Sequence, residues 1–340
     1  MDNSEPERAT KRSALLCELA RVQGHHGDSY VARGPWRVRA RDLTATRLAA
    51  RLFRPQIPGL GPKIVGGLAV SARWRAHVDL PIQNEAVQIA DSGERVRTFD
   101  PKDGSSHKLV LRDSKYGKGV DADLSVRHGL LVDARVPHPR VRNSARWGDH
   151  IMIQEELVSG RRFLPPIDRG RIPEGLVEPL SRLYAQAGPK QVPLAEWLGP
   201  GRAQAIAALE AGLGPDTPAL RRARRLVERN PMITLGFGHG DFLPSNLAVS
   251  RDGVCFLDWE TAGYAPVAFD LLRLWRKYPR VTALARGAGV LVHRYQTGAI
   301  DLRDTASLSL ALCCLGGTSD RARLALRQWT HLPAGRGAGD

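Results

Sequence analysis

The stretch GHGDFLPSNLAVSRDGVCFLDWETAGYAPVAFDL, residues 238–271, decides the fold of this 340-residue chain. A polar turn, His239-Gly240-Asp241, precedes the apolar run NLAV. Asp252-Gly253 is a tight-turn signal, and the apolar run VCFL follows it directly. The pattern predicts a β-hairpin that brings Asn246 and Asp258 close together, although twelve residues separate them in the sequence.

The residue types around this hairpin suit phosphoryl transfer. A carboxylate has to orient or deprotonate the acceptor hydroxyl, and Asp241 is the only carboxylate in its turn. A metal ion has to neutralise the phosphates, and hard cations prefer oxygen ligands. The amide oxygen of Asn246 and the carboxylate of Asp258 are such ligands. We therefore predict that Asp241 is catalytic and that Asn246 and Asp258 bind Mg²⁺ or Mn²⁺.

These residues resemble the signature of the aminoglycoside phosphotransferase/choline kinase family, which has a protein-kinase-like fold. The signature is an H-G-D turn, an asparagine five residues after the aspartate, and an apolar strand that ends in D-W-E or D-W-D. The chain has His239-Gly240-Asp241, Asn246 and Asp258-Trp259-Glu260 at these spacings. The resemblance is strongest over residues 230–275. It implies ATP or GTP as co-substrate and an alcohol group as phosphate acceptor.

The same resemblance implies supporting roles for three residues near the hairpin. His239 would brace the loop without transferring a proton. Asp270 matches the aspartate that opens the next helix in the family and would hydrogen-bond the catalytic loop. Glu260 would either assist the metal site or be a solvated charge at a strand end.

The region before the motif predicts short strands, and the region after residue 176 is mostly helical in pattern. The strand-like runs are EAVQIA (85–90), RVRTF (95–99), KLVL (108–111) and DHIMIQEELV (149–158), with a helix expected over 121–133. Gly-containing turns between the first three runs are typical of an antiparallel meander. Strands followed by helices predict an α+β chain. With the resemblance, they predict a bilobal protein-kinase-like fold with a small antiparallel β lobe and a larger, mostly helical lobe.

The predicted organisation has four parts. The expected boundaries are an N-terminal extension over residues 1–80, a nucleotide-binding β lobe over 81–158, a helical catalytic and substrate lobe over 159–335, and a tail over 336–340. The extension is expected to be disordered over residues 1–12 and partly helical beyond them, with helical patterns at 13–22 and 43–53.

Within the β lobe, the resemblance implies a basic side chain on the third strand that holds the nucleotide phosphates. The family usually has lysine there, whereas the strand Leu109-Val110-Leu111 is followed by Arg112. Arginine can bind phosphate in bidentate fashion, so Arg112 is chemically suitable. Lys108 lies on the same strand face and is the alternative. The usual helix glutamate is missing from residues 121–133, so Asp123 is the nearest substitute by spacing.

Two further segments are predicted to contact the nucleotide. The turn Asp91-Ser92-Gly93-Glu94 would cover the phosphates with the backbone N–H groups of Ser92 and Gly93. The segment IQEELVSGR, residues 153–161, would be the hinge, where the backbone of Glu156 and Val158 contacts the adenine edge. A plain edge strand has the same sequence pattern.

The charge of the chain restricts its substrates. The net charge is +15, yet only eight of the 50 basic residues are lysine, a bias that GC-rich coding explains better than attraction to an anionic partner does. Residues 159–235 are rich in arginine, which disfavours a polycation such as an aminoglycoside. We expect a neutral or anionic hydroxyl compound, such as a natural product or antibiotic.

Alternatives to a small-molecule kinase remain open at this stage. One is a Ser/Thr kinase of a ribosomal precursor peptide, and another is a non-catalytic kinase-like binding module. Nucleic-acid binding rests on charge alone, because no recognition motif is present. The four cysteines lack C-x-x-C spacing, no apolar run reaches the ~18–20 residues of a membrane span, and the N-terminus lacks a signal-peptide pattern. These features favour a cytoplasmic protein without a membrane partner.

Overall fold

The computed structural model describes five strands in the first hundred residues and most of the chain from residue 103 to residue 315. The described residues are 28–33, 36–39, 77–80, 86–89, 95–100, 103–111, 124–147, 150–158, 160–213, 218–297, 300–315, 329 and 332. Ser92, Gly93, Arg112 and Asp123 lie outside them, as do the helices expected at 13–22 and 43–53. The described residues form two compact units. The first comprises those up to His128 together with Pro139–Arg162, and the second comprises Gly129–His138 and those from Phe163 onward.

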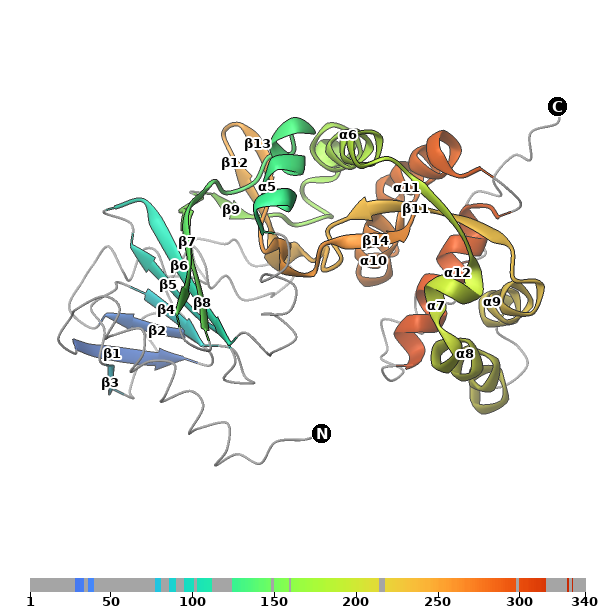
Figure 1. Ribbon diagram of the computed structural model, residues 1–340, viewed down its shortest axis with the longest axis horizontal. Helices are drawn as coiled ribbons and strands as arrows, with labels where there is room; N and C mark the ends of the chain where they lie inside the picture. Colours follow the sequence, from blue (N-terminus) through green and yellow to red (C-terminus); the bar gives the residue numbers. More distant parts are fainter. Residues whose placement is uncertain are drawn as a thin grey trace. The chain divides into compact units, whose positions relative to one another are not determined.

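The first unit contains an antiparallel sheet of eight described strands in the order β3-β1-β2-β4-β5-β6-β8-β7 (Figure 1). Its strands are β1 (Asp28–Arg33), β2 (Trp36–Arg39), β3 (His77–Leu80), β4 (Ala86–Ile89), β5 (Arg95–Asp100), β6 (Ser105–Leu111), β7 (Val141–Trp147) and β8 (His150–Glu156). The predicted meander is confirmed as β4, β5 and β6, and the predicted strand at 149–158 is confirmed as β8. Strands β1, β2 and β3 extend the sheet into a region for which sequence analysis assigned no strands.

The second unit is mainly helical, with short strands that shape one loop region. Its described elements from residue 163 are η1 (Arg169–Arg171), η2 (Pro173–Val177), α6 (Glu178–Ala187), β10 (Lys190–Pro193), α7 (Leu194–Leu198), α8 (Pro200–Leu213), α9 (Pro218–Arg229), β11 (Met232–Gly238), η3 (Pro244–Asn246), β12 (Leu247–Ser250), β13 (Gly253–Phe256), η4 (Trp259–Thr261), β14 (Gly263–Pro266), α10 (Phe269–Lys277), α11 (Thr282–Tyr295) and α12 (Leu302–Leu315). Helix α5 (Leu124–Asp133) and the two-residue strand β9 (Arg161–Arg162) precede them. The α+β class is therefore confirmed.

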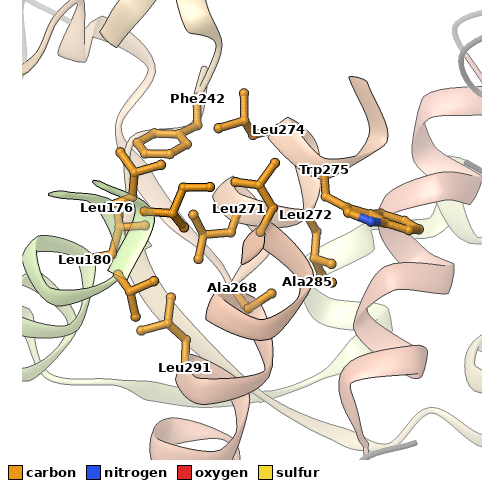
Figure 2. Close-up of a cluster of buried hydrophobic side chains, with 14 of the residues drawn as sticks. Leu176, Leu180, Phe242, Ala268, Leu271, Leu272, Leu274, Trp275, Ala285 and Leu291 are labelled. Carbon is orange, nitrogen blue, oxygen red and sulfur yellow. The ribbon is translucent and has the colours of Figure 1, made fainter. Parts of the chain in front are cut away.

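Helix α10 lies at the centre of the main hydrophobic core. Its apolar residues recur at helical spacing, so one broad face of the helix is buried. Figure 2 shows Leu271, Leu274 and Trp275 of this helix among side chains from η2, α6 and α11. Each fully buried leucine contributes roughly 1.5–3 kcal/mol of stability. This core fixes α10, and with it the polar residues of its first turn.

The predicted hairpin is present as β12 and β13. Leu247 pairs with Phe256 and Ser250 pairs with Gly253, with Arg251-Asp252 as the turn. Phe242 is fully buried and lies edge-on to Phe256, with ring centroids 5.1 Å apart. The hairpin and the loop before it therefore pack in the same hydrophobic core as α10. In the described part of the chain, no helix is long and apolar enough to cross a membrane.

Candidate active site

The turn after β11 approaches neighbouring backbone so closely that it requires glycine. Gly240 has a φ of +77°, a region that L side chains rarely adopt. A Cβ atom at Gly240 would lie 2.1 Å from the carbonyl oxygen of Thr261. At Gly238 it would lie 2.6 Å from Oδ2 of Asp270. The two glycines therefore bring the His239–Asp241 turn against η4 and α10.

Asp270 connects this turn to the first turn of α10. Its Oδ2 accepts a hydrogen bond from the backbone N–H of His239 at 2.7 Å, and its Oδ1 accepts one from Gly240 at 3.1 Å. The side chain is buried, and burial raises the pKa of the Asp270 carboxyl. The nearby His239, the two amide hydrogen bonds and Arg273 act in the opposite direction. Asp270 thus accepts hydrogen bonds from two backbone N–H groups of the turn that contains Asp241.

His239 uses both ring nitrogens within the protein. Its Nε2 lies 2.6 Å from the carbonyl oxygen of Leu257, and its Nδ1 accepts the backbone N–H of Asp241 at 3.3 Å. These partners assign the proton to Nε2, because a carbonyl can only accept and an amide can only donate. The ring is fully buried and lies against Trp259, with centroids 4.6 Å apart. The imidazole therefore links the turn to the end of the hairpin.

Asp241 is held from two sides while remaining about one-third exposed. Its Oδ2 accepts a hydrogen bond from Nδ2 of Asn246 at 3.0 Å. Its Oδ1 forms an ion pair with Nη2 of Arg273 at 2.8 Å, and the Asp241 side chain is 35% exposed. Arg273 also donates to the carbonyl oxygen of Gly240. Together Asn246 and Arg273 fix the carboxylate in one orientation, with access to solvent.

Arg273 is a site residue that the sequence analysis missed. It lies three residues after Asp270, so both project from the same face of α10. A signal was present, since an aspartate and an arginine at this spacing share a helix face. Which loop that face would meet depends on the tertiary fold, which the spacing does not reveal.

Asn246 and Asp258 lie at the same end of the hairpin. The backbone N–H of Leu257 donates to the carbonyl oxygen of Asn246 at 2.8 Å. The Nδ2 of Asn246 donates to the carboxylate of Asp241 and, at 2.9 Å, to its carbonyl oxygen. Because Nδ2 faces Asp241, the amide oxygen of Asn246 is on the opposite side of the amide group, where it can bind a cation. Asp258 adopts a left-handed backbone conformation, with φ of 62°, which is costly for a residue with a side chain.

This donor set fits a hard divalent cation. One amide oxygen and one carboxylate suffice for Mg²⁺, because that ion usually retains several waters. No cluster of three or more His, Cys, Asp or Glu side chains suited to a metal occurs among the residues that the structure describes. A dense site of the zinc type is therefore not seen there. Glu260 lies in η4, two residues after Asp258, and is buried.

In the first unit, Lys108 lies on β6, between β5 and β8 in the sheet, and is almost completely buried. Its Nζ donates a hydrogen bond to Oε1 of Glu155 on β8 at 3.0 Å.

The two predicted hinge residues lie at the end of β8. The backbone N–H of Glu156 donates to the carbonyl oxygen of Arg140 at 2.8 Å, so a contact with adenine would have to use the carbonyl of Glu156. Val158 lies just beyond the strand.

A cavity of about 820 Å³ lies elsewhere in the second unit. It is lined by residues 166–178, from the segment around η1 and η2, and by residues 280–290, mainly of α11. None of the predicted site residues lines it, so it is separate from the His239–Asp258 constellation.

The loop, the hairpin and the α+β fold class all agree with the protein-kinase-like architecture expected from the sequence. The model of the phosphotransferase enzyme family, APH, matches residues 90–307, which is more than half of the chain. The chain therefore belongs to this family, and the resemblance seen in the sequence is confirmed. Comparison with curated protein sequences finds no significant match.

Comparison with solved structures finds, among others, three kinases or phosphotransferases of low sequence identity. A thermostable mutant of aminoglycoside phosphotransferase APH(4)-Ia is 14% identical, with a TM-score of 0.47 over 70% of this chain and 89% of that one. Amicoumacin kinase hAmiN is 15% identical, with a TM-score of 0.42 over 70% and 84% of the respective chains. Choline kinase LicA from Streptococcus pneumoniae is 13% identical, with a TM-score of 0.42 over 70% and 90%.

Proposed function

We propose that this protein transfers the γ-phosphate of ATP or GTP to a hydroxyl group of a small molecule that is not a polycation. The observation that carries the proposal is the fixed, solvent-accessible carboxylate of Asp241, bonded to Asn246 and Arg273. Membership of the phosphotransferase family supports the reaction class. The non-catalytic alternative gains no support, because the Asp241, Asn246 and Asp258 set is complete.

Asp241 is proposed to act on the acceptor hydroxyl. Its carboxylate would accept the hydroxyl hydrogen bond and then the proton as the acceptor oxygen attacks the γ-phosphorus. The new oxygen–phosphorus bond forms as the bond to the β-phosphate oxygen breaks, and the nucleoside diphosphate leaves. The hydrogen bond from Asn246 and the ion pair with Arg273 reduce the freedom of the carboxylate, so its orientation is set before the acceptor binds.

Asn246 and Asp258 are proposed to hold Mg²⁺ or Mn²⁺ through their side-chain oxygens. Such an ion neutralises the negative charge of the nucleotide phosphates. His239 and Asp270 would then support the site without touching the substrate, since their polar atoms contact the backbone of the loop and hairpin. Glu260 stays a candidate for assisting the metal site.

The nucleotide contacts are proposed for the first unit. Lys108 is the described basic residue on the third predicted strand, and Glu156 and Val158 occupy the predicted hinge. Arg112, Ser92, Gly93 and Asp123 stay predictions of the sequence, because they lie outside the described residues.

The arginine face of α9 supports a neutral or anionic acceptor. Arg221, Arg225 and Arg229 recur every four residues and are all exposed, so they form one stripe along the helix. Arg224 is exposed too, although it pairs with Glu228. A stripe of positive charge repels a polycation such as an aminoglycoside.

The proposal is tested by a transfer assay with radiolabelled ATP and GTP. The acceptor panel contains neutral polyols, hydroxylated anionic compounds, serine- and threonine-containing peptides and aminoglycosides. We expect divalent-metal-dependent labelling of a neutral or anionic small molecule and weak or no labelling of aminoglycosides. Labelling of peptides alone would favour the peptide-kinase alternative. A protein that neither binds nor turns over either nucleotide would overturn the proposal.

A further inference from the structure

The cavity of about 820 Å³ in the second unit is lined by three arginines and by apolar residues. Arg169 lies in η1, Arg280 lies two residues before the start of α11, and Arg286 lies within α11. All three residues are exposed, so a ligand can reach their side chains from solvent. The volume falls within the range of about 300–1,000 Å³ that is usual for sites that bind small molecules.

The charges of these three arginines are not neutralised by the described part of the chain. Among the described residues, none forms a hydrogen bond or an ion pair with the guanidinium group of Arg169, Arg280 or Arg286. Glu178 is the one acidic residue among those that line the cavity, and it forms an ion pair with Arg294 at 3.7 Å. Three arginines and one glutamate give the lining a positive formal charge. A concave surface that is lined by one sign of charge concentrates ions of the opposite sign.

The rest of the lining is mainly apolar. Val177 of η2 and Val281, which precedes α11, are buried, whereas Val290 of α11 is 45% exposed. The first turn of α11 contains no acidic residue. Sites for small molecules are typically lined by apolar side chains together with a few polar groups that fix the orientation of the ligand. This lining therefore suits a ligand that has an apolar body and a negatively charged group.

The wall formed by η2 and α11 is packed against the main hydrophobic core. A Cβ atom at Gly287 of α11 would lie 2.6 Å from Cγ2 of Val177, so the glycine permits the close approach of the two segments. Val177 and Leu291, which Figure 2 labels, both belong to the core. Because this wall is already in place without a ligand, little ordering has to accompany binding, and the cost of binding is lower.

We propose that this cavity is a second binding site for a small organic anion with an apolar body, such as an aromatic carboxylate. The anionic group is bound by the three arginines, because a guanidinium group can donate two parallel hydrogen bonds to a carboxylate or a phosphate. The apolar body packs on the valines. The inference goes beyond the proposed function and does not rest on it, since none of the residues proposed for phosphoryl transfer lines the cavity.

Three probes with the same ring system separate the effect of charge from that of apolar contact. They are the anionic naphthoate, the neutral naphthamide and the cationic naphthylmethylammonium, each substituted at the same ring position. Calorimetry gives a Kd for each probe. We expect naphthoate to bind at least roughly tenfold more tightly than naphthamide, as for hydrogen bonds to a charged group, and the cation to bind most weakly. Added salt should weaken the binding of naphthoate and leave that of naphthamide nearly unchanged, because salt screens exposed charges.

Two substitutions locate the bound anion. Arg169→Gln and Arg286→Gln each remove one charge from a different element of the lining, and neither should change the melting temperature because both residues are exposed. Each should weaken naphthoate binding about threefold, as for an exposed ion pair. The double variant should weaken it about tenfold, because the effects of residues on separate elements add. The affinity for naphthamide should stay unchanged in all of them.

Arg221→Gln is the matched control. It removes the same charge from an exposed position on α9, which does not line the cavity, and should leave the affinity for naphthoate unchanged. An equal loss of affinity in this control and in Arg169→Gln and Arg286→Gln would overturn the inference, because it would reflect the net charge of the protein. Equal binding of naphthoate and naphthamide by the wild type, or binding of none of the three probes, would overturn it too. A wild type that binds naphthoate as expected but neither ATP nor GTP would contradict the proposed function alone.

Discussion

At the scale of single residues, the candidate site depends on polar groups that each have two partners. One ring nitrogen of His239 is hydrogen-bonded to the carbonyl of Leu257, and the other to the backbone N–H of Asp241. The carboxylate of Asp270 accepts hydrogen bonds from two backbone N–H groups. Asp241 is bonded by Asn246 and Arg273. Because His239 and Asp270 are buried, removal of one of their partners leaves a buried polar atom unsatisfied, which is costly.

Gly240→Ala should destabilise the protein strongly. The left-handed backbone alone costs about 1–2 kcal/mol for a residue with a side chain, and the new Cβ would meet the Thr261 carbonyl oxygen at 2.1 Å. Thermal unfolding should show a clear fall in melting temperature. Gly129→Ala is the control: Gly129 lies in α5, and a Cβ there would have no atom within 4 Å, so alanine should raise stability slightly. Equal shifts for the two variants would contradict this account.

Asp258→Asn should remove the metal-dependent part of nucleotide affinity. An amide is a poorer ligand than a carboxylate for a hard cation, so ADP should bind the variant no more tightly with Mg²⁺ than with a chelator. Calorimetry in both conditions measures this difference. Asp252→Asn, at the exposed opposite end of the same hairpin, should keep the metal dependence of the wild type. A normal Mg²⁺ effect in Asp258→Asn would exclude Asp258 as a ligand.

At the scale of elements, α9 and α12 are joined by a charged contact. Arg222 of α9 forms an ion pair with Asp301 at 2.9 Å and another with Asp304 of α12. The hydrogen bond to Asp304 is the largest cause of a raised pKa at Arg222, whereas burial acts against it. Asp304 is buried, so without Arg222 its carboxylate would lose its counterion. The contact therefore fixes the helix that bears the arginine stripe.

Arg222→Ala should lower the free energy of unfolding by roughly 2 kcal/mol. This is less than the 3–5 kcal/mol of a fully buried pair, because the Arg222 side chain is 29% exposed. Chemical denaturation measures the change. The neighbouring Arg221→Ala should change stability by less than about 0.5 kcal/mol, as for other exposed sites. If the two variants were equally stable, the contact would not hold the helices together.

The elements also show what the sequence could and could not predict. The hairpin at 247–256 follows from local turn chemistry, and the start of α9 follows from a proline in its first turn. Strands β1 to β3 are four to six residues long. β1 pairs with its sequence neighbour β2, but the pairing of β1 with β3 and of β2 with β4 is non-local. Local patterns carry little information about such pairing.

At the scale of the whole molecule, the motif identified the family and the fold class, whereas several partners of its residues emerged only from the structure. Asp241, Asn246 and Asp258 are recognisable because their spacing is short and fixed. Arg273 and Glu155 were not singled out, because their contacts join segments 32 and 47 residues apart. Their interactions depend on how α10 meets the loop and how β8 registers with β6. Four predicted site residues lie outside the described part of the chain and stay predictions.

The central claim is that Asp241 acts on the acceptor hydroxyl, and the variant Asp241→Asn tests it most directly. The measurement compares kcat with the best acceptor of the panel, together with nucleotide Kd and melting temperature, for the wild type and the variant. We predict that kcat falls at least roughly a hundredfold, as for loss of a general base, while nucleotide Kd changes little because Asn246 and Asp258 remain. Turnover within a few-fold of the wild type, or a loss of stability that alone accounts for the loss of activity, would contradict the claim.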